Sequence, residues 1–261
     1  MMLTLADDLA CALDPALFME RLGLTPDPWQ ANLLRSAEQR FLLLCTRQAG
    51  KSTVTAILAL HRVLYHPGSL VLMLSPSERQ SGEIFKKMLT FYADLGKPVK
   101  EKYATLLRLE LENGSRCISL PGSEHTVRGY SGVDLLIIDE ASRVKDDLYY
   151  SVRPMLAVSG GSLIALTTPF GKRGFFFDEW EKADETWQRF QVTAYDCPRI
   201  SQAFLDEERA ALGEWWFKQE YLCEFVDRTD SLFSYESIMA AFENNDVKPL
   251  FGEDGSWQAT S

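Results

Sequence analysis

Short runs of consecutive apolar residues recur along this chain, separated by longer stretches in which polar and apolar residues mix. A strand of a parallel sheet is buried on both faces, so it is apolar along its whole length. We predict strands at 41–45, 70–75, 104–109, 115–120, 134–139, 162–167 and 188–194. We predict helices at 51–65, 77–94, 145–156 and 201–212. This alternation predicts an α/β fold, a mostly parallel sheet with helices on both faces.

Residues 104–120 differ from this scheme. Apolar residues lead up to Leu111, Asn113-Gly114 follows, and a second strand pattern starts at Arg116. Asn-Gly between two such patterns is a strong signal for a hairpin turn. The sequence therefore predicts one antiparallel hairpin in an otherwise parallel sheet.

The first 40 residues are predicted to be helical. Asp14 before Pro15 is typical of a helix start, and the helix should end at Gly23. A turn that begins at Thr25 then leads into a second helix, which we expect to run to about Arg40.

The chain changes character after residue 200. Aromatic residues gather at 215–217 and 220–225, and they predict helices that pack on the core. The Gly/Ser-rich end at 252–261 is expected to fray. We therefore expect a helical segment at 1–40, an α/β core at 41–200, and a small helical subdomain with a frayed linker at 201–261.

Composition is typical of a globular domain and argues against several other classes of protein. Of 261 residues, 46% are hydrophobic and 25% are charged. The five cysteines form no C-x-x-C pair and the three histidines no ligand spacing, so we expect neither zinc nor a disulfide framework. Free thiols suit a reducing cytoplasm. Asp7 and Asp8 interrupt any signal peptide, and no apolar run is long enough for a membrane span, so we expect no membrane partner.

The formal net charge of −10 argues against a domain coated with DNA-binding charge. It leaves nucleic acid possible as a partner, because a ring of subunits can present a few lysines to a central channel. The local basic groups are Lys86-Lys87, Lys97 to Lys102, and Lys172-Arg173. Each is more typical of a solvated face than of a binding patch.

The most informative stretch lies between residues 41 and 60. A short apolar strand is followed by a loop, by Gly50-Lys51-Ser52, and then by an apolar helical run. This order is the context that a P-loop requires, because loop amides and the helix N-terminus then point at bound phosphates. Lys51 would add a charge on the phosphates, and the Ser52 hydroxyl would reach Mg²⁺. The first glycine of the motif is replaced by Cys45, and the alternative is a surface loop with an incidental lysine.

A second apolar strand ends in two carboxylates, Asp139 and Glu140. The carboxyl end of a parallel strand opens onto the ligand crevice of such a sheet. Asp139 would then hold Mg²⁺, and Glu140 would polarise an attacking water. The alternative is a strand followed by an ordinary acidic helix start.

A third strand ends in Thr167-Thr168-Pro169. Pro169 biases Thr168 towards an extended backbone and stops the strand. Hydroxyls at such a strand end can report the presence of a γ-phosphate, although Thr-Thr-Pro alone is an ordinary loop start.

Taken together, these segments resemble the ATPase part of the large terminase subunit of tailed bacteriophages. Thr46-Arg47-Gln48-Ala49-Gly50-Lys51-Ser52-Thr53 resembles the family's P-loop, which carries an early arginine and often lacks the first glycine. Four further segments look like the family's Walker B strand, coupling motif, adenine-side motif and closing stretch: Leu136–Ala141, Thr167–Pro169, Trp29-Gln30 and Glu220–Phe225. The resemblance spans roughly residues 25 to 230.

The resemblance implies a P-loop NTPase core of the RecA/ASCE type that binds ATP and Mg²⁺. It implies a motor that moves double-stranded DNA into a procapsid, as a ring of subunits on the portal protein, together with the small terminase subunit. Such a motor works in the host cytoplasm, transiently on the portal, and is absent from the mature virion. Only 36 residues follow Phe225 (261 − 225), so we expect no nuclease activity in this chain.

The resemblance also implies roles for individual residues. Trp29 and Gln30 would lie beside the adenine, whose edge suits the donor and acceptor of Gln30. Thr167 and Thr168 would sense the γ-phosphate.

Two arginines are candidates for stabilising charge in the transition state. Arg47 would act on the phosphates of its own subunit. Arg128 lies in a glycine-bounded loop and would reach the nucleotide of a neighbouring subunit.

Two other interpretations remain open at this stage. A helicase-like ATPase that remodels nucleic acid shares the P-loop and the Asp-Glu pair, but 261 residues leave no room for a second RecA-like domain. A non-catalytic nucleotide-binding protein would not need Lys51, Asp139 and Glu140 together.

Overall fold

A computed structural model describes residues 4–76, 78–121, 127, 129–182, 184–227 and 239–240. The chain divides into two compact units, Met1–Val226 and Asp227–Ser261. The architecture described below is that of the first unit. The segment boundaries expected after residues 40 and 200 both fall inside this unit and stay predictions.

The described residues form one eight-stranded sheet with the order β3-β4-β5-β2-β6-β7-β1-β8. Its strands are β1 (Arg40–Cys45), β2 (Leu70–Ser75), β3 (Glu101–Ala104), β4 (Arg108–Leu111), β5 (Arg116–Pro121), β6 (Leu135–Asp139), β7 (Ser162–Thr167) and β8 (Gln188–Val192). The six strands from β5 to β8 in this order pair in parallel, and β3 and β4 pair antiparallel at one edge. The predicted mostly parallel sheet is thus confirmed.

The hairpin around Asn113-Gly114 is also confirmed, since β4 and β5 are antiparallel and Gly114 has a φ of 84°. The strand predicted at 104–109 is wrong in its position. A turn lies there instead, with the Thr105 amide donating to the Arg108 carbonyl over 2.8 Å. Leu106 is 86% exposed on this turn. Its apolar run therefore marks a loop between β3 and β4 and not a strand.

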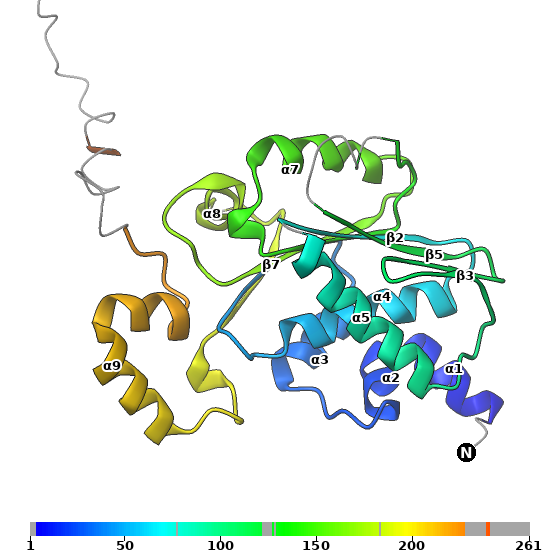
Figure 1. Ribbon diagram of the computed structural model, residues 1–261, viewed down its shortest axis with the longest axis horizontal. Helices are drawn as coiled ribbons and strands as arrows, with labels where there is room; N and C mark the ends of the chain where they lie inside the picture. The colour runs from blue at the N-terminus through cyan, green and yellow to red at the C-terminus, as the bar shows by residue number, and fades with distance from the viewer. Residues whose placement is uncertain are drawn as a thin grey trace, which may run out of the picture. The chain divides into compact units, whose positions relative to one another are not determined.

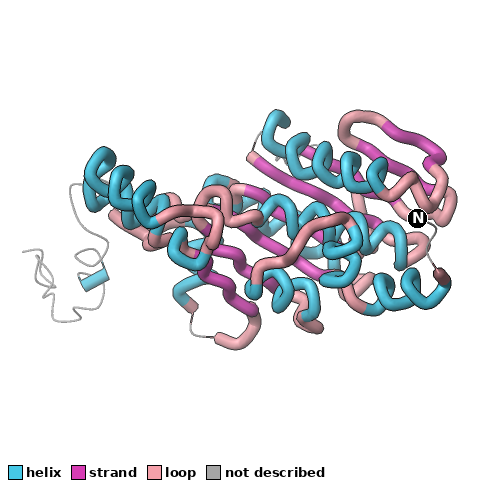
Figure 2. The backbone as a smooth tube through the Cα atoms, turned by 90° about the horizontal axis from the view of Figure 1, so that it is seen from below, coloured by secondary structure: helices cyan, strands magenta, loops and turns pink. Residues whose placement is uncertain are grey.

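Helices cover both faces of the sheet (Figure 1). They are α1 (Leu5–Leu13), α2 (Pro15–Arg21), α3 (Pro28–Arg35), α4 (Lys51–Tyr65), α5 (Glu78–Asp94), α7 (Asp146–Val152), α8 (Gly174–Glu181) and α9 (Gln202–Tyr221), with 3-10 turns at η1 (Ala141–Arg143), η2 (Arg153–Leu156) and η3 (Ala194–Asp196). Helices α1 to α5 pack on one face, as Figure 2 shows from their side, and α7 and α8 pack on the other. None of the described helices is long and apolar enough to cross a membrane.

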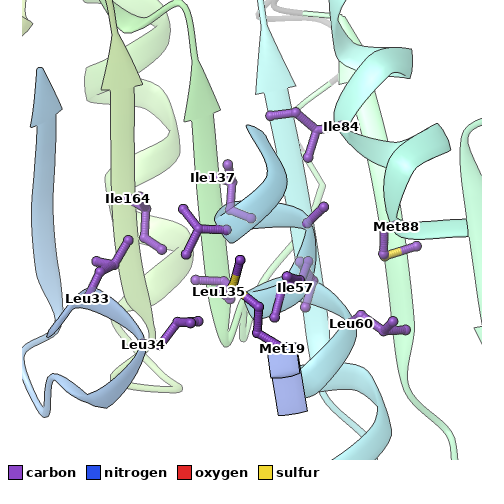
Figure 3. Close-up of a cluster of buried hydrophobic side chains, with 14 of the residues drawn as sticks. Met19, Leu33, Leu34, Ile57, Leu60, Ile84, Met88, Leu135, Ile137 and Ile164 are labelled. Atoms are coloured by element: carbon purple, nitrogen blue, oxygen red, sulfur yellow. The ribbon is translucent and has the colours of Figure 1, made fainter. Parts of the chain in front are cut away.

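Alternate residues of each central strand face the two helical layers. Along β1, Leu43 packs with α2 to α5, whereas Leu42 and Leu44 pack with α7 and α8. Figure 3 shows side chains of four helices that meet Leu135, Ile137 and Ile164 of the sheet. This burial on both sides explains why the central strands are apolar throughout.

Several predicted helix ends are wrong. The helix expected at 145–156 ends at Val152 and continues as the 3-10 turn η2, because Pro154 lacks an amide hydrogen and crowds the preceding turn. The helix expected to reach Arg40 ends at Arg35, and Arg40 already belongs to β1. The helix expected at 201–212 continues to Tyr221 as α9, with a kink at Gly213, whose φ is 77°.

The N-terminal helices meet α4 at a buried histidine. His61 is 6% exposed, and its Nε2 lies 3.0 Å from the Cys11 carbonyl oxygen. Burial lowers the pKa of His61 from 6.5 to about 4. The unfolded chain therefore takes up this proton at higher pH than the folded chain, and stability falls as the pH drops through that window.

We expect His61→Gln to remove this part of the acid lability. The free energy of unfolding of the variant, relative to that of the wild type, should rise by about 2–3 kcal/mol between neutral pH and pH ~4. Urea titrations at several pH values measure this difference. His66→Gln is the control, because His66 is exposed and should contribute less. A difference that stays constant with pH would contradict the prediction.

Candidate functional site

The three sequence motifs meet at one edge of the sheet. Strands β6, β7 and β1 are neighbours in this order, and all run in parallel. The register pairs Leu44 of β1 with Thr167 of β7, and Asp139 of β6 with Leu166 of β7. The P-loop, the two threonines and the carboxylates thus leave adjacent strand ends. In open α/β sheets this edge is where ligands bind.

The loop after β1 has the backbone shape of a phosphate cradle. Gln48 and Gly50 both have positive φ values, 61° and 90°. The φ of Gly50 favours glycine, and a Cβ there would come within 2.6 Å of Gln30 Nε2, so the Gln30 side chain would have to shift. Gly50 is the N-cap of α4, whose first amides have no partner within the helix. Such an end favours a bound anion.

A cavity of about 380 Å³ opens beside this loop. Its lining residues are Met19, Leu24, Thr25, Gln30, Gln48, Gly50, Lys51, Ser52, Thr53, Lys87 and Arg199. Its cationic residues come from the P-loop, from α5 and from Arg199, and its apolar residues, Met19 and Leu24, come from α2 and the turn after it. This mixed lining suits a ligand that carries both anionic groups and a flat ring.

Lys87 is a cavity residue that the sequence interpretation missed. Its Nζ donates to Thr53 Oγ1 over 3.1 Å, which brings α5 to the start of α4. The signal was present in the helical spacing, because Ile84, one turn before Lys87, and the adjacent Met88 are buried, whereas Lys86 is exposed. The pair Lys86-Lys87 was interpreted as a solvated face, which holds only for Lys86.

Gln30 joins α3 to the P-loop. Its Oε1 accepts from the Asp27 amide over 2.9 Å, and its Nε2 donates to the Gly50 carbonyl over 3.3 Å. Arg199 then clamps Asp27 with two hydrogen bonds of 2.9 and 2.7 Å, and its Nη2 lies 3.4 Å from the Ala49 carbonyl. Arg199 was also missed, and no local pattern indicates it.

Asp139 is a buried carboxyl at the end of β6. It is 9% exposed, and its Oδ1 accepts from the Glu140 amide over 2.9 Å. Burial raises the pKa of Asp139 to about 6, assisted by the charge of Glu140 and opposed by Lys51 and Lys87. A carboxylate that is costly to ionise in isolation is stabilised when a cation binds beside it.

The donor set fits a magnesium ion. Ser52 and Asp139 offer a hydroxyl and a carboxylate, which are hard oxygen ligands. No group of three or more His, Cys, Asp or Glu side chains able to hold a metal occurs in the part of the chain that the structure describes. Mg²⁺ is commonly held by one or two protein ligands together with phosphates and water, so a small set is sufficient.

Glu140 leaves the strand in a left-handed conformation, with φ 48° and ψ 43°. Its Oε2 lies 3.9 Å from Arg143 Nε, in a weak ion pair. Thr167 is buried, donates to the Thr168 carbonyl over 2.7 Å, and accepts from the Ser142 amide over 3.3 Å. Thr167 therefore connects the end of β7 to the segment after Glu140.

Eight of the predicted site residues that the structure describes do not line the cavity. Four of them, Asp139, Glu140, Thr167 and Thr168, end or follow β6 and β7. Trp29 is 9% exposed and packs in the core, and its Nε1 has no hydrogen-bond partner among the described residues. Ala49 is buried. Thr46 is buried and donates to the Glu220 carbonyl over 2.7 Å. Arg47 is exposed, and its Nε lies 2.6 Å from Glu220 Oε2. Arg128 falls outside the described residues.

Comparison with known proteins gives a consistent result. The family profile "Terminase large subunit, T4likevirus-type, N-terminal" matches residues 42–239. The large terminase subunit of Thermus phage G20c is 25% identical, with 83% of this chain and 52% of the relative covered. That of Escherichia phage T5 is 28% identical, with 90% and 56% covered. The chain thus spans about half the length of these curated relatives.

Solved structures show the same fold. The large terminase ATPase domain of Thermus phage P74-26 superposes with a TM-score of 0.71 at 23% identity, over 82% of this chain and all of that one. The large terminase of another thermophilic bacteriophage, in complex with ADP, superposes with a TM-score of 0.63 at 14% identity, over 77% and 53%. Because the family profile covers more than half of its residues, this chain belongs to the family of the N-terminal part of the T4likevirus-type terminase large subunit.

Proposed function

We propose that this chain hydrolyses ATP as the motor part of a large terminase and that this hydrolysis drives double-stranded DNA into a procapsid. The observation that carries the proposal is the meeting of the P-loop, the two carboxylates and Thr167 at one sheet edge, beside a cavity that holds Lys51 and Lys87. Membership of the terminase family supports the DNA-packaging part of the proposal.

In this proposal, each part of ATP lies against particular residues of the site. The phosphates lie at the start of α4, where Lys51 and Lys87 supply positive charge. The adenine lies between Met19, Leu24 and the Gln30 side chain. Ser52 and Asp139 would hold Mg²⁺, which would neutralise charge on the phosphates. Glu140 polarises the attacking water at its carboxylate, and Thr167 and Thr168 respond to the γ-phosphate.

Arg47 acts in cis on the phosphates in this proposal. Its guanidinium is engaged with Glu220 of α9, so it must leave that partner to reach the cavity. Thr46 also donates a hydrogen bond to the Glu220 carbonyl. A movement of the P-loop would therefore shift the end of α9. This contact is consistent with the segment from residue 201 acting as a lid.

We expect Lys87→Ala to slow ATP hydrolysis by about 10-fold or more, because it removes a charge beside the phosphates. The variant should also bind nucleotide more weakly. This loss of affinity should be larger for a non-hydrolysable ATP analogue than for ADP, since the outermost phosphate carries the most charge. Phosphate release and fluorescent-nucleotide binding measure the two effects. Lys86→Ala is the matched control and should behave as wild type. Equal behaviour of both variants would remove Lys87 from the site.

We propose Arg128 as a finger that acts on the neighbouring subunit's nucleotide. A Lys51→Ala subunit offers Arg128 without a working site, and an Arg128→Ala subunit offers a working site without the finger. Mixing the two inactive variants under assembling conditions should restore part of the ATPase activity. The trans role is wrong if the mixture stays inactive while wild type assembles and turns over, or if Arg128→Ala alone is fully active.

The partners follow from the proposed motor. We infer a ring of copies on the portal protein, loaded by the small terminase subunit, in the host cytoplasm. Phosphate release at increasing protein concentration, with and without Mg²⁺ and duplex DNA, tests the proposal. Mg²⁺-dependent turnover that rises with assembly and with DNA is expected. A chain that neither binds nor hydrolyses ATP under any of these conditions would refute it.

A further inference from the structure

A second cavity, of about 580 Å³, lies just beyond the catalytic carboxylates. We call it the Phe170 pocket. It is lined by residues from the segment after Glu140 and from the loop after β7: Ser142, Arg143, Val144, Lys145, Asp146, Asp147, Phe170, Arg173 and Gly174. None of these residues belongs to the ATP site described above.

Two arginine side chains of the pocket, those of Arg143 and Arg173, lie against the ring of Phe170. The Cζ atoms of Arg143 and Arg173 lie 3.8 and 5.4 Å from the centroid of Phe170. Contact with a ring face holds a guanidinium in place and leaves its N–H groups free for a planar or tetrahedral anion. Lys145 adds a third positive charge at the wall. The ring therefore preorganises the charges of this pocket.

The acidic residues of the wall only partly offset these charges. Asp146 Oδ1 already accepts from the Phe175 amide over 2.7 Å at the start of α8. The Ser142 Oγ is buried and has no hydrogen-bond partner among the described residues. The pocket thus offers a local excess of positive charge in a chain whose net charge is −10.

The pocket is connected to the hydrolytic residues. Arg143 contacts the ring of Phe170 and also lies 3.9 Å from Glu140 Oε2 through its Nε. Ser142 bonds to Thr167 through its amide. An anion that draws the Arg143 guanidinium into the pocket therefore withdraws it from the Glu140 carboxylate.

We propose that the Phe170 pocket binds a backbone phosphate of duplex DNA and that Arg143 couples its occupancy to Glu140. Arginine, lysine and hydroxyl donors are the groups that proteins use on DNA phosphates. With DNA bound, Arg143 turns to the phosphate, and Glu140 is free to polarise water. This inference rests on the proposed function, because only a motor that acts on DNA requires such coupling.

The first test measures DNA affinity directly. Binding of a fluorescein-labelled duplex of about 30 base pairs, long enough to offer several phosphate contacts, is followed by anisotropy at several KCl concentrations. Arg173→Gln should weaken binding several-fold. It should also make the negative slope of log K against log [salt] less steep by about 1, the value of one lost phosphate contact. Arg153→Gln is the matched control, because Arg153 also lies over a ring, that of Tyr149, but does not line the pocket.

An unchanged affinity and salt slope in Arg173→Gln would overturn the proposal, as would a wild-type chain with no measurable affinity for the duplex. Sedimentation of the same samples tests the alternative occupant, a second copy of the chain. A change in assembly without a change in DNA affinity would make the pocket a subunit interface and would also overturn the proposal.

The second test measures coupling. The ratio of ATPase rates with and without duplex DNA should fall to about one in Arg143→Gln, with the DNA-free rate raised because Glu140 is no longer held. Stimulation equal to that of wild type would overturn the coupling. A wild-type chain that binds the duplex but hydrolyses no ATP refutes the proposed function and, with it, the coupling. In that case the salt slope of Arg173→Gln still tests whether the pocket binds a DNA phosphate.

Discussion

Lys51→Ala is expected to abolish ATP hydrolysis and to leave the fold intact. Lys51 begins α4 and lines the cavity, where a partly desolvated charge on the phosphates is worth far more than it would be in water. Loss of such a contact should cost several kcal/mol, or about 10³-fold in rate. Single-turnover phosphate release measures the effect.

The fold should survive because α4 is held by its apolar face. Residues such as Val54, Ile57 and Leu60 are fully buried, and the Lys51 side chain contributes none of that packing. Circular dichroism and thermal unfolding of the variant provide the control. Turnover like that of wild type would remove Lys51 from the phosphate site, and with it the central element of the proposed mechanism.

Glu140→Gln should separate binding from hydrolysis. The substitution keeps the shape of the side chain and removes the negative charge that, in the proposed mechanism, polarises water. Hydrolysis should slow by about 10²–10⁴-fold, the usual contribution of general base catalysis. ATP binding should persist, because Lys51, Lys87 and the start of α4 are unchanged, and ATP-bound oligomers should accumulate.

Asp139→Ala is the comparison variant, which tests whether the two adjacent carboxylates have separate roles. It removes the proposed Mg²⁺ ligand, so it should weaken binding of the Mg²⁺–nucleotide complex as well as hydrolysis. Fluorescent-nucleotide titrations with and without Mg²⁺ distinguish the two variants. An equal loss of nucleotide binding in both would count against separate roles for the adjacent carboxylates.

The errors in the predicted elements have local physical causes. The run Leu106-Leu107 has the composition of a strand, but a tight turn between β3 and β4 places Leu106 in solvent. Pro154 lies within an apolar run that suits a helix, and it converts the last turn to 3-10 geometry. In both cases hydrophobicity was interpreted without the backbone geometry that the neighbouring residues impose.

The six parallel strands, the hairpin turn and the order of the motifs were determined by the sequence itself, because each depends on residues within a few positions of one another. An apolar run predicts a strand that is buried on both faces, and Gly50-Lys51-Ser52 between a strand and a helix predicts a phosphate cradle. The parallel arrangement then places the carboxyl ends of β1, β6 and β7 at the same edge of the sheet, and the observed strand order makes them neighbours.

Only the tertiary structure decided which other side chains complete the site. Lys87 bonds to Thr53 across 34 positions, Arg199 to Asp27 across 172, and Arg47 to Glu220 across 173. The Phe170 pocket likewise joins the segment after β6 to the loop after β7. Such contacts depend on how helices and loops pack against the sheet, and a single charged residue in a solvated stretch carries no periodic signal that would indicate its distant partner.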